Sequence, residues 1–407
     1  MGMPLFAVLG GLATVLFMTA GTPPVAVLSA AYELATHPTL AALPVFTLAG
    51  FVLAEGDTAS RLLRIFRAWL GWMPGGTAVV CVLVCAFFTI FTGGSSVTIL
   101  ALGGVLLPAL LQDGYGQEFS VGLLTGSSSL GLLLPPALPL ILYSIVTEMP
   151  LADLFRGGLL PGLLMIGLVA AYAVHTGRRR ARPQVPFDAR EGAAALWHGK
   201  WELLLPVVVL GAFFSGYATI LETSALTALY ALVVQVFVHQ NIPIGRPLRR
   251  VFAASAATIG GVLLILFVAY GLTAYLIDAD VPSTIASWTR QHVHSRLVFL
   301  LILNVFLLAV GCVMDMYSAI LVIAPIVLPL GAVFGIHPVH LGIIFVANLE
   351  LGYITPPVGL NLFLAAQRFE RPLLSVCRAS LPLLAMLAAA VLFITYLPWL
   401  TTALLRP

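Results

Sequence analysis

The sequence predicts an all-α polytopic membrane protein with an inverted repeat, two re-entrant helical hairpins and two broken transmembrane helices. Three observations lead to this fold class: apolar stretches of membrane-spanning length, glycine and proline breaks inside some of them, and recurrence of those breaks at one constant offset. Of the 407 residues, 60% are hydrophobic and 9% are charged, whereas soluble domains carry about 25% charged residues. This composition excludes a soluble enzyme, a nucleic-acid binder and a disordered scaffold.

Seven stretches are suited to an uninterrupted crossing, which takes about 17–25 mostly apolar residues. They lie near residues 4–20, 41–56, 155–176, 201–218, 219–239, 252–277 and 379–404. The arginine- and proline-rich stretch between the third and the fourth, residues 177–200, is predicted to be a cytoplasmic linker.

Two further apolar stretches, 119–148 and 341–368, contain tandem prolines near their middle. Pro135-Pro136 interrupts the first and Pro356-Pro357 the second. Because proline lacks the backbone donor and clashes with the preceding turn, a continuous helix through either pair is disfavoured. Both stretches are therefore predicted to be broken helices.

Two more stretches, 77–111 and 297–333, are too long for one crossing and have polar centres. The first centre reads Thr92-Gly-Gly-Ser-Ser-Val-Thr98, and the second reads Gly311-Cys-Val-Met-Asp-Met-Tyr-Ser318. We interpret each stretch as a re-entrant hairpin whose turn stops inside the membrane. A pair of tightly joined crossings is the alternative.

The basic residues indicate the orientation, since cytoplasmic loops carry an excess of Lys and Arg. With nine crossings and two hairpins, fifteen of the nineteen basic residues fall on one side and four on the other. This bias places the first terminus in the cytoplasm and the last outside. It also makes the first hairpin enter from the cytoplasm and the second from the exterior.

Glycines and prolines of the first half recur 221 positions later. Matching pairs are Gly50 and Gly271, Pro108 and Pro329, Gly114 and Gly335, Gly131 and Gly352, Pro135-Pro136 and Pro356-Pro357, and Pro161 and Pro382. Because the two units enter from opposite sides, they form an inverted repeat, which secondary transporters use to expose one midplane site alternately to each side.

Four segments follow from this repeat. They are an N-terminal scaffold with an amphipathic arm (1–76), a first transport repeat (77–176), a linker with scaffold helices (177–296) and an inverted second transport repeat (297–407).

The hairpin turns and helix breaks are the candidate ion site. Irregular backbone at membrane depth is tolerated where it is enclosed, and its freed carbonyls can coordinate a hard cation such as Na⁺. The residues predicted to bind Na⁺ are Gly93, Gly94, Ser95, Ser96, Thr98, Gly131, Pro135, Gly311, Asp315, Ser318, Gly352, Thr355 and Gly359. No other metal or cofactor is expected.

The same breaks are the candidate substrate site. No lysine or arginine lies at them, so an anionic substrate would be held by backbone dipoles, hydroxyl groups and the bound cation. The residues predicted to bind substrate are Ser127, Ser128, Pro136, Pro139, Asn348, Glu350, Pro357 and Asn361.

Asp315 and Glu350 are carboxylates within the broken elements, where a charge is costly. We expect Asp315 to cap a helix or coordinate near the cation, and Glu350 to contribute to a polar cavity or a proton route. Buried pairing with serine hydroxyls or backbone donors is the alternative for both.

The motifs at these positions resemble the large membrane subunit (DctM type) of tripartite ATP-independent periplasmic (TRAP) transporters. The matching segments are Leu43–Gly50, Met73–Gly76, Gly93–Thr98, Pro135-Pro136, Pro325–Pro329, Gly335–His340 and Thr355–Asn361. By position, the family's cation sites fall on Ser95, Ser96, Thr98 and Pro135–Pro139 in one repeat, and on Asp315, Ser318 and Thr355–Asn361 in the other.

The resemblance implies Na⁺-driven uptake of a small organic acid by an elevator movement in the bacterial inner membrane. It also implies two partners on separate chains: a small membrane subunit (DctQ type) and a periplasmic substrate-binding protein (DctP type). Dicarboxylates, sialic acids, sugar acids and keto acids remain open as substrates.

Three alternatives compete with this hypothesis. A stand-alone anion carrier or antiporter of similar hairpin architecture would need no binding protein. A channel also uses re-entrant hairpins, but its repeats are less often this large and inverted. An intramembrane hydrolase is disfavoured, since no Ser/His, Asp/Asp or metal-type set falls together in the spans, and we predict no enzymatic activity.

Overall fold

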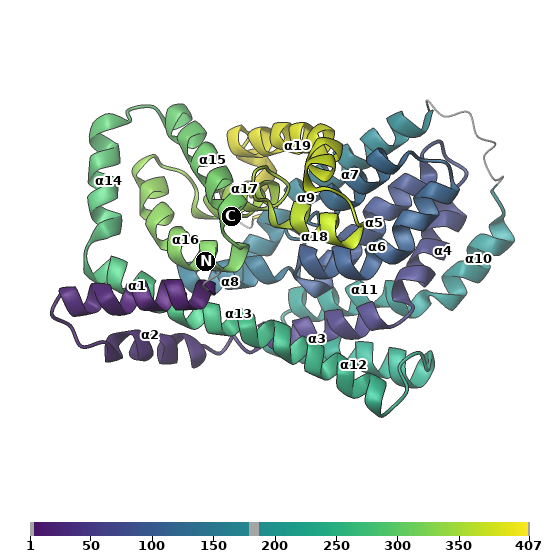
Figure 1. The fold of residues 1–407 in the computed structure, drawn as a ribbon, viewed down its shortest axis with the longest axis horizontal. Helices are drawn as coiled ribbons and strands as arrows, with labels where there is room; N and C mark the ends of the chain where they lie inside the picture. Colours follow the sequence, from purple (N-terminus) through teal and green to yellow (C-terminus); the bar gives the residue numbers. More distant parts are fainter. Residues whose placement is uncertain (1–3, 179–186, 406–407) are drawn as a thin grey trace.

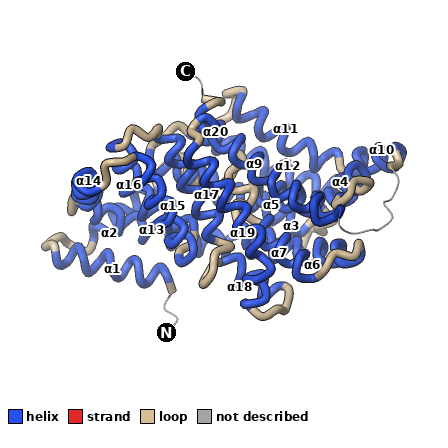
Figure 2. Tube along the Cα trace, turned by 90° about the horizontal axis from the view of Figure 1, so that it is seen from above, coloured by secondary structure: helices blue, strands red, loops and turns tan. Residues whose placement is uncertain are grey.

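The computed structural model describes residues 4–178 and 187–405 of the chain. Over these residues the regular secondary structure is helical throughout (Figure 2). Seven of the described helices are long and apolar enough to cross a membrane, and two bent pairs of shorter helices raise that number to nine. The prediction of an all-α polytopic membrane protein is therefore confirmed.

Four helices precede the first predicted hairpin: α1 (Leu5–Thr19), α2 (Val25–Ala35), α3 (Ala42–Glu55) and α4 (Thr58–Leu70). The stretch 4–20 was expected to cross the membrane, but α1 has only 15 residues, fewer than the roughly 17 that a crossing needs. The chain turns at Pro23-Pro24, and α2 returns beside α1 (Figure 1).

A 70° bend separates α3 from α4. Helix α4 is amphipathic, and three arginines on successive turns of it form ion pairs with three other elements. The pairs are Arg61 Nε with Glu202 Oε1 at 2.7 Å, Arg64 Nε with Glu191 Oε1 at 2.9 Å, and Arg67 Nη2 with Asp113 Oδ1 at 2.7 Å.

Each predicted hairpin is two helices joined at its polar centre. The first consists of α5 (Gly76–Thr92) and α6 (Ser95–Gln112), and the second of α15 (Arg296–Val313) and α16 (Met316–Val333). Gly93 ends α5 with φ +63°, a conformation that glycine adopts without steric cost. The turns thus fall at the predicted positions.

Both predicted broken helices are interrupted. The first consists of α7 (Gln117–Ser127) and α8 (Leu138–Thr147), and the second of α17 (Pro338–Gly352) and α18 (Leu360–Arg368). Pro135-Pro136 and Pro356-Pro357 lie within the interruptions, and the bond between the two prolines is cis in both pairs.

The remaining helices connect and surround these elements. They are α9 (Leu151–Arg178), α10 (Ala189–His198), α11 (Lys200–Phe214), α12 (Ile220–Leu232) with the π-helical turn η1 (Val233–Val238), α13 (Arg246–Asp278), α14 (Val281–His292), α19 (Leu373–Tyr396) and α20 (Trp399–Thr402). Helices α10 and α14 were not predicted, because each is short and too polar to be recognised as a crossing. Most of the predicted linker's polar centre lies outside the described residues.

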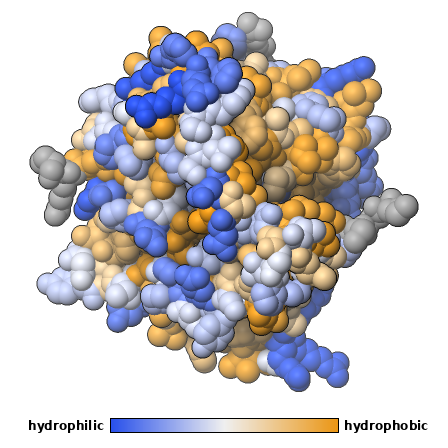
Figure 3. All heavy atoms as spheres, turned by 90° about the vertical axis from the view of Figure 1, so that its left-hand side faces the viewer, coloured by the Kyte–Doolittle hydropathy of each residue, from blue (hydrophilic) through white to orange (hydrophobic). Residues whose placement is uncertain are grey.

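Helix α13 runs along one edge of the molecule and packs against α1, α2, α3 and α16 (Figure 1). Only 22% of its most apolar 18-residue window is buried, against 56% of that of α16. The exposed apolar surface of α13 is suited to contact lipid, whereas α16 belongs to the interior. Broad apolar surface is also visible from the end that carries α14 (Figure 3).

Candidate functional site

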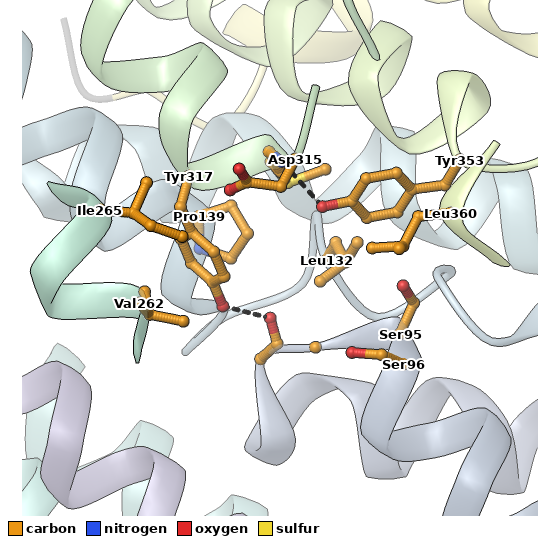
Figure 4. A pocket seen from close by; sticks show the side chains of 13 residues that line it. Ser95, Ser96, Leu132, Pro139, Val262, Ile265, Asp315, Tyr317, Tyr353 and Leu360 are labelled. Carbon is orange, nitrogen blue, oxygen red and sulfur yellow. Dashed lines mark hydrogen bonds between the residues drawn. The ribbon is translucent and has the colours of Figure 1, made fainter. Parts of the chain in front are cut away.

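The turns of the two hairpins face each other across a cavity of about 220 Å³ (Figure 4). The first turn and the start of α6 form one wall, and the second turn with the start of α16 forms the opposite wall. The residues that line the cavity are Gly93, Gly94, Ser95, Ser96, Leu132, Pro139, Val262, Ile265, Asp315, Met316, Tyr317, Tyr353 and Leu360.

Ten of these thirteen residues form five pairs separated by the repeat offset of 221. The pairs are Gly94 and Asp315, Ser95 and Met316, Ser96 and Tyr317, Leu132 and Tyr353, and Pro139 and Leu360. Because equivalent residues of both repeats line one cavity, the cavity lies on the pseudo-twofold axis that relates them. Transporters built from inverted repeats hold their substrate and ion sites at the interface between the repeats.

The two halves of the cavity differ in chemistry. The first repeat contributes the hydroxyls of Ser95 and Ser96, whereas the second contributes the carboxylate of Asp315 and two phenols. Asp315 is the only charged side chain among the lining residues. The cavity wall therefore favours a cation, and an anion would need that cation as a counter-charge.

The first hairpin turn is connected to both helix breaks. Ser95 Oγ donates a hydrogen bond to Asn361 Oδ1 at 2.7 Å, and Asn361 Nδ2 donates to Ser128 Oγ at 3.1 Å. Ser95 begins α6, Ser128 ends α7, and Asn361 lies in the first turn of α18. Three residues that the sequence predicted as ion or substrate ligands thus form one buried chain.

A pair of threonines lies behind this turn. Thr98 Oγ1 lies 2.8 Å from Thr89 Oγ1, and Thr89 Oγ1 donates to the Ser128 carbonyl oxygen at 2.6 Å. Thr98 was predicted as an ion ligand, whereas Thr89 was missed. Thr89 Oγ1 also lies 2.8 Å from Cys85 O, so its one hydroxyl hydrogen is shared between two carbonyl oxygens. Threonines inside apolar helices commonly bond to their own backbone in this way, so nothing in the sequence distinguished Thr89 from other threonines.

Asp315 acts as the N-cap of α16. Its Oδ2 accepts from Ser318 N at 3.0 Å, and its Oδ1 accepts from Ser318 Oγ at 2.5 Å. The predicted capping role of Asp315 is confirmed, and the same two contacts are the pairing with a serine hydroxyl and a backbone donor that was given as the alternative. Coordination of a cation by Asp315 stays a prediction. Since a carboxylate has about four acceptor positions, two further positions remain toward the cavity that Asp315 lines.

Two tyrosines complete this side of the cavity (Figure 4). Tyr317 OH donates to Gly93 O at 2.7 Å, which joins the two hairpin turns, and Tyr353 OH accepts from Met316 N at 2.8 Å. The sequence hypothesis included neither as a ligand. The position of Tyr317 in the second polar turn could have identified it from the sequence as a residue of the site. Tyr353 follows a buried helix, and nothing in the sequence distinguished it.

The second helix break is connected to the end of α15. Gly359 N donates to Cys312 O at 3.1 Å, and Cys312 Sγ donates to Thr355 O at 3.2 Å. Thr355 Oγ1 donates to Leu351 O at 2.8 Å within its own helix end. The predicted ion ligands Thr355 and Gly359 thus lie next to the second hairpin but do not line the cavity.

Three predicted glycines lie where helices approach closely. A Cβ atom on Gly352 would lie 2.5 Å from the Gly311 carbonyl carbon, and one on Gly131 would lie 2.4 Å from Ala86 O. Gly352 and Gly131 are equivalent in the two repeats. These positions let the broken helices contact the backbone of the hairpins.

The predicted substrate residues are mostly outside the cavity. Pro139 lines it, whereas Ser127, Ser128, Pro136, Asn348, Glu350, Pro357 and Asn361 do not. Asn348 belongs instead to a buried network in which its Nδ2 donates to Asn304 Oδ1 at 2.8 Å. Thr395 Oγ1 donates to the same oxygen at 3.0 Å.

The donors around the cavity suit a hard cation rather than a transition metal. Among the described residues, no group of three or more His, Cys, Asp and Glu side chains is placed to hold a metal ion. Carboxylate, hydroxyl and carbonyl oxygens predominate instead, and hard cations prefer such ligands.

The chain is similar to a family of membrane transport proteins. Residues 1–400 match the family described as "Tripartite ATP-independent periplasmic transporter, DctM component". The C4-dicarboxylate TRAP transporter large permease protein DctM of Pseudomonas aeruginosa is 35% identical over 376 residues, which are 92% of this chain and 87% of the relative. The isethionate TRAP transporter permease protein DctMQ of Oleidesulfovibrio alaskensis is 33% identical, over 98% of this chain and 63% of the relative.

A solved structure shares the fold. The crystal structure of the Alcanivorax borkumensis YdaH transporter, described as having an unusual topology, aligns with a TM-score of 0.66 at 16% identity. The alignment covers 92% of this chain and 87% of that one. This likeness concerns the fold alone. The family match over residues 1–400 and the 35% identity to the Pseudomonas aeruginosa permease show that the chain belongs to the family of large permease subunits (DctM component) of TRAP transporters.

Proposed function

We propose that this permease takes up a small organic acid by Na⁺-coupled symport in the bacterial inner membrane. The observation that carries the proposal is the cavity on the repeat axis, lined by Asp315 and by hydroxyls of both hairpin turns. One cation held by Asp315 would be neutralised by that carboxylate, so a carboxylate substrate would need a further cation as its counter-charge, because no Lys or Arg side chain lines the wall.

Na⁺ is proposed to bind at the hairpin turns. Gly93 O, Ser96 Oγ and the free acceptor positions of Asp315 provide oxygen donors around the cavity. Bound Na⁺ would supply the positive charge that the substrate carboxylate requires. Within the chain, the hydrogen bonds of Ser95, Asn361 and Ser128 would hold the first turn against the two helix breaks.

An elevator movement is the proposed mechanism. Val262 and Ile265 of α13 form one wall of the cavity, while the other lining residues belong to the hairpins and broken helices. Since α13 also packs against α1, α2 and α3, this apolar wall suits a stationary scaffold past which the hairpin-bearing part slides.

Two partners are proposed: a small membrane subunit and a periplasmic substrate-binding protein, as the family name implies. The substrate is left at the class of small organic acids, because relatives named for different substrates, C4-dicarboxylates and isethionate, have similar identity to this chain.

Uptake by purified components in proteoliposomes tests the proposal. The permease would be reconstituted with the small subunit and the binding protein encoded beside it, the latter loaded with its identified ligand. An inward Na⁺ gradient should drive accumulation, and an equal K⁺ gradient should not. Accumulation without a Na⁺ gradient, or without the binding protein, would instead support a stand-alone carrier, and electrical conductance far above carrier turnover would indicate a channel.

A further inference from the structure

Three arginines lie on one face of α13 where the helix begins. Arg246, Arg249 and Arg250 are spaced i, i+3 and i+4, so their side chains leave the helix on the same side, and all three are exposed. We call them the arginine cluster. Basic residues at a helix N-terminus oppose the helix dipole, so the cluster does not serve the stability of α13 itself.

The same face of α13 continues as an exposed apolar stripe. Ala253, Ala257 and Leu264 follow the cluster at helical spacing and are exposed. The opposite face, which carries Val251 and Ile259, is buried. Apolar surface that extends over several turns of a membrane helix is suited to contact acyl chains, and the arginine cluster lies at the end of it.

The arginine cluster has no acidic partner. Residues 223–277 contain neither Asp nor Glu, and within the described part of the chain none of the three guanidinium groups lies at ion-pairing distance from a carboxylate. The arginines of α4 differ, because Arg61, Arg64 and Arg67 each pair with a carboxylate of another element. The charge of the cluster is therefore available to a partner outside the chain.

Exposed apolar side chains flank the cluster. Phe237 in η1 is 63% exposed, and Ile244 in the loop before α13 is 71% exposed. The predicted orientation places this end of α13 on the cytoplasmic side, where anionic lipids attract basic residues next to a crossing. An arginine at this level keeps its aliphatic stem among acyl chains while its guanidinium group reaches the headgroups.

An anionic phospholipid fits this surface better than a free anion or a second protein does. Its phosphate offers oxygens to the fork of a guanidinium group, and its acyl chains cover the stripe, which free phosphate would leave uncovered. A helix of another chain could pack on the small side chains of the stripe. Such a helix would also need carboxylates at the level of the cluster, whereas a layer of anionic headgroups supplies the charge at that level without any such match.

We propose that the arginine cluster and the apolar stripe of α13 form a binding surface for an anionic phospholipid. The headgroup phosphate binds the cluster, and an acyl chain lies along the stripe. The surface is distinct from the cavity, to which α13 contributes Val262 and Ile265. Because α13 packs against α1, α2 and α3, the bound lipid holds this end of the helix and its neighbours at a fixed depth in the bilayer. The proposal does not depend on Na⁺ coupling or on the substrate.

Fluorescence quenching in lipid tests the proposal on the full-length chain. A fluorophore is attached at Ala254→Cys, beside the stripe, in a Cys377→Ser background, because the other three cysteines are buried. The protein is placed in phosphatidylcholine nanodiscs that contain a small fraction of phosphatidylglycerol or phosphatidylcholine spin-labelled on the acyl chain. Phosphatidylglycerol should quench at the lower mole fraction, and equal quenching by the two lipids would overturn the proposal.

Removal of the charges should abolish this preference. An arginine near an anionic surface contributes about fivefold to binding, so Arg249→Gln should reduce the preference about fivefold. Neutralisation of all three arginines to Gln should bring it to that of phosphatidylcholine. Arg64→Gln is the matched control, because it removes the same charge from an arginine that already pairs with Glu191, and it should change the preference by less than about twofold. Equal losses in Arg64→Gln and Arg249→Gln would replace a site with general surface charge.

Two measurements keep the test valid where the neutral variants fail to fold. Substitution of all three arginines by Lys keeps the charge and should keep most of the preference. In the protein with native arginines, a rise from about 0.1 M to about 1 M salt shortens the screening length from about 10 Å to about 3 Å and should weaken the preference. A preference that does not respond to salt would contradict a charged headgroup site.

The remaining outcomes identify another occupant. Inorganic phosphate added at constant ionic strength should leave the quenching by phosphatidylglycerol unchanged, because phosphate does not cover the stripe. Displacement of the lipid by phosphate would assign the cluster to a soluble anion. Displacement by the small membrane subunit would assign this face of α13 to a protein contact, and either result would overturn the proposal.

Discussion

The hydroxyl group of Tyr317 donates a hydrogen bond to the carbonyl oxygen of Gly93 at 2.7 Å, which ties the second hairpin turn to the first (Figure 4). The two residues are 224 positions apart in the chain. Gly93 O is one of the oxygens that a cation in the cavity would use, so the phenol and the cation compete for it.

Removal of this hydrogen bond should therefore strengthen cation binding. Tyr317→Phe keeps the ring but frees Gly93 O, and a hydrogen bond is worth about 1 kcal/mol. We expect the half-saturating Na⁺ concentration for uptake to fall by about fivefold. Tyr353→Phe is the matched control, because its hydroxyl contacts Met316 N instead. An unchanged or higher Na⁺ requirement in Tyr317→Phe would contradict competition at Gly93.

Asp315 combines a helix cap with a charge, and two substitutions separate these roles. Asp315→Asn keeps a good N-cap residue for α16 but removes the charge. It should raise the half-saturating Na⁺ concentration at least about tenfold with little change in thermal stability. Asp315→Ala should do the same and also lose about 1 kcal/mol of cap stability.

Flux assays and thermal unfolding in detergent measure the two effects. Ser96→Ala serves as the comparison from the first turn, and should raise the Na⁺ requirement without affecting a cap. If Asp315→Asn and Ser96→Ala both leave the Na⁺ dependence unchanged, these residues do not contribute to the cation site.

Gly352 should tolerate no side chain. A Cβ atom there would lie 2.5 Å from the carbonyl carbon of Gly311, so Gly352→Ala must separate α15 from α17. Overpacking of this kind costs about 1–3 kcal/mol, and the unfolding temperature in detergent should fall. In contrast, Gly260→Ala in α13 meets no atom within 4 Å and should be neutral or stabilising by up to about 1 kcal/mol. Equal effects of the two substitutions would refute the close helix contact.

Because of His239, which lies at the junction of α4, α11 and η1, the stability of the folded protein should depend on pH. Its Nε2 lies 3.3 Å from Glu202 Oε1, which also pairs with Arg61. Burial, followed by the charge of Arg61, lowers the pKa of His239 below its ordinary value of 6.5. The unfolded chain therefore binds a proton more readily than the folded protein, and the stability due to neutral His239 is lost as the pH falls below 6.5.

Thermal unfolding between neutral and mildly acidic pH measures this effect. The unfolding temperature should decrease toward acid, and His239→Gln should remove that part of the decrease because glutamine does not titrate. A variant whose acid dependence matches the wild type would show that other groups are responsible.

Much of the site was predictable because its features are local. Glycine at Gly93 and the tandem prolines constrain their own backbone, so the hairpin turns and helix breaks follow from the residues at those positions. Asp315 and Ser318 form a cap three residues apart, which is also a local pattern. The chain from Ser95 through Asn361 to Ser128 was anticipated only as a set of candidates, and the structure brings them together.

The remaining features depend on how helices are rotated and packed. Asn348 and Glu350 are two residues apart and so lie on opposite sides of α17; Asn348 faces Asn304, and Glu350 is buried elsewhere. Both were predicted to bind substrate, but neither lines the cavity. The contribution of Val262 to the wall of the cavity likewise depends on the packing of α13 against α16.

The sequence by itself determined the membrane class, the breaks and the repeat offset of 221. These three features depend on composition or on the backbone preferences of single residues. Composition and backbone preferences do not change with the packing of distant parts of the chain. Tertiary structure decided that residues of both repeats line one cavity, and that Ser95, Asn361 and Ser128 form one buried chain. Those outcomes require contacts between residues more than 200 positions apart, and such contacts are set by the relative rotation of helices rather than by local sequence.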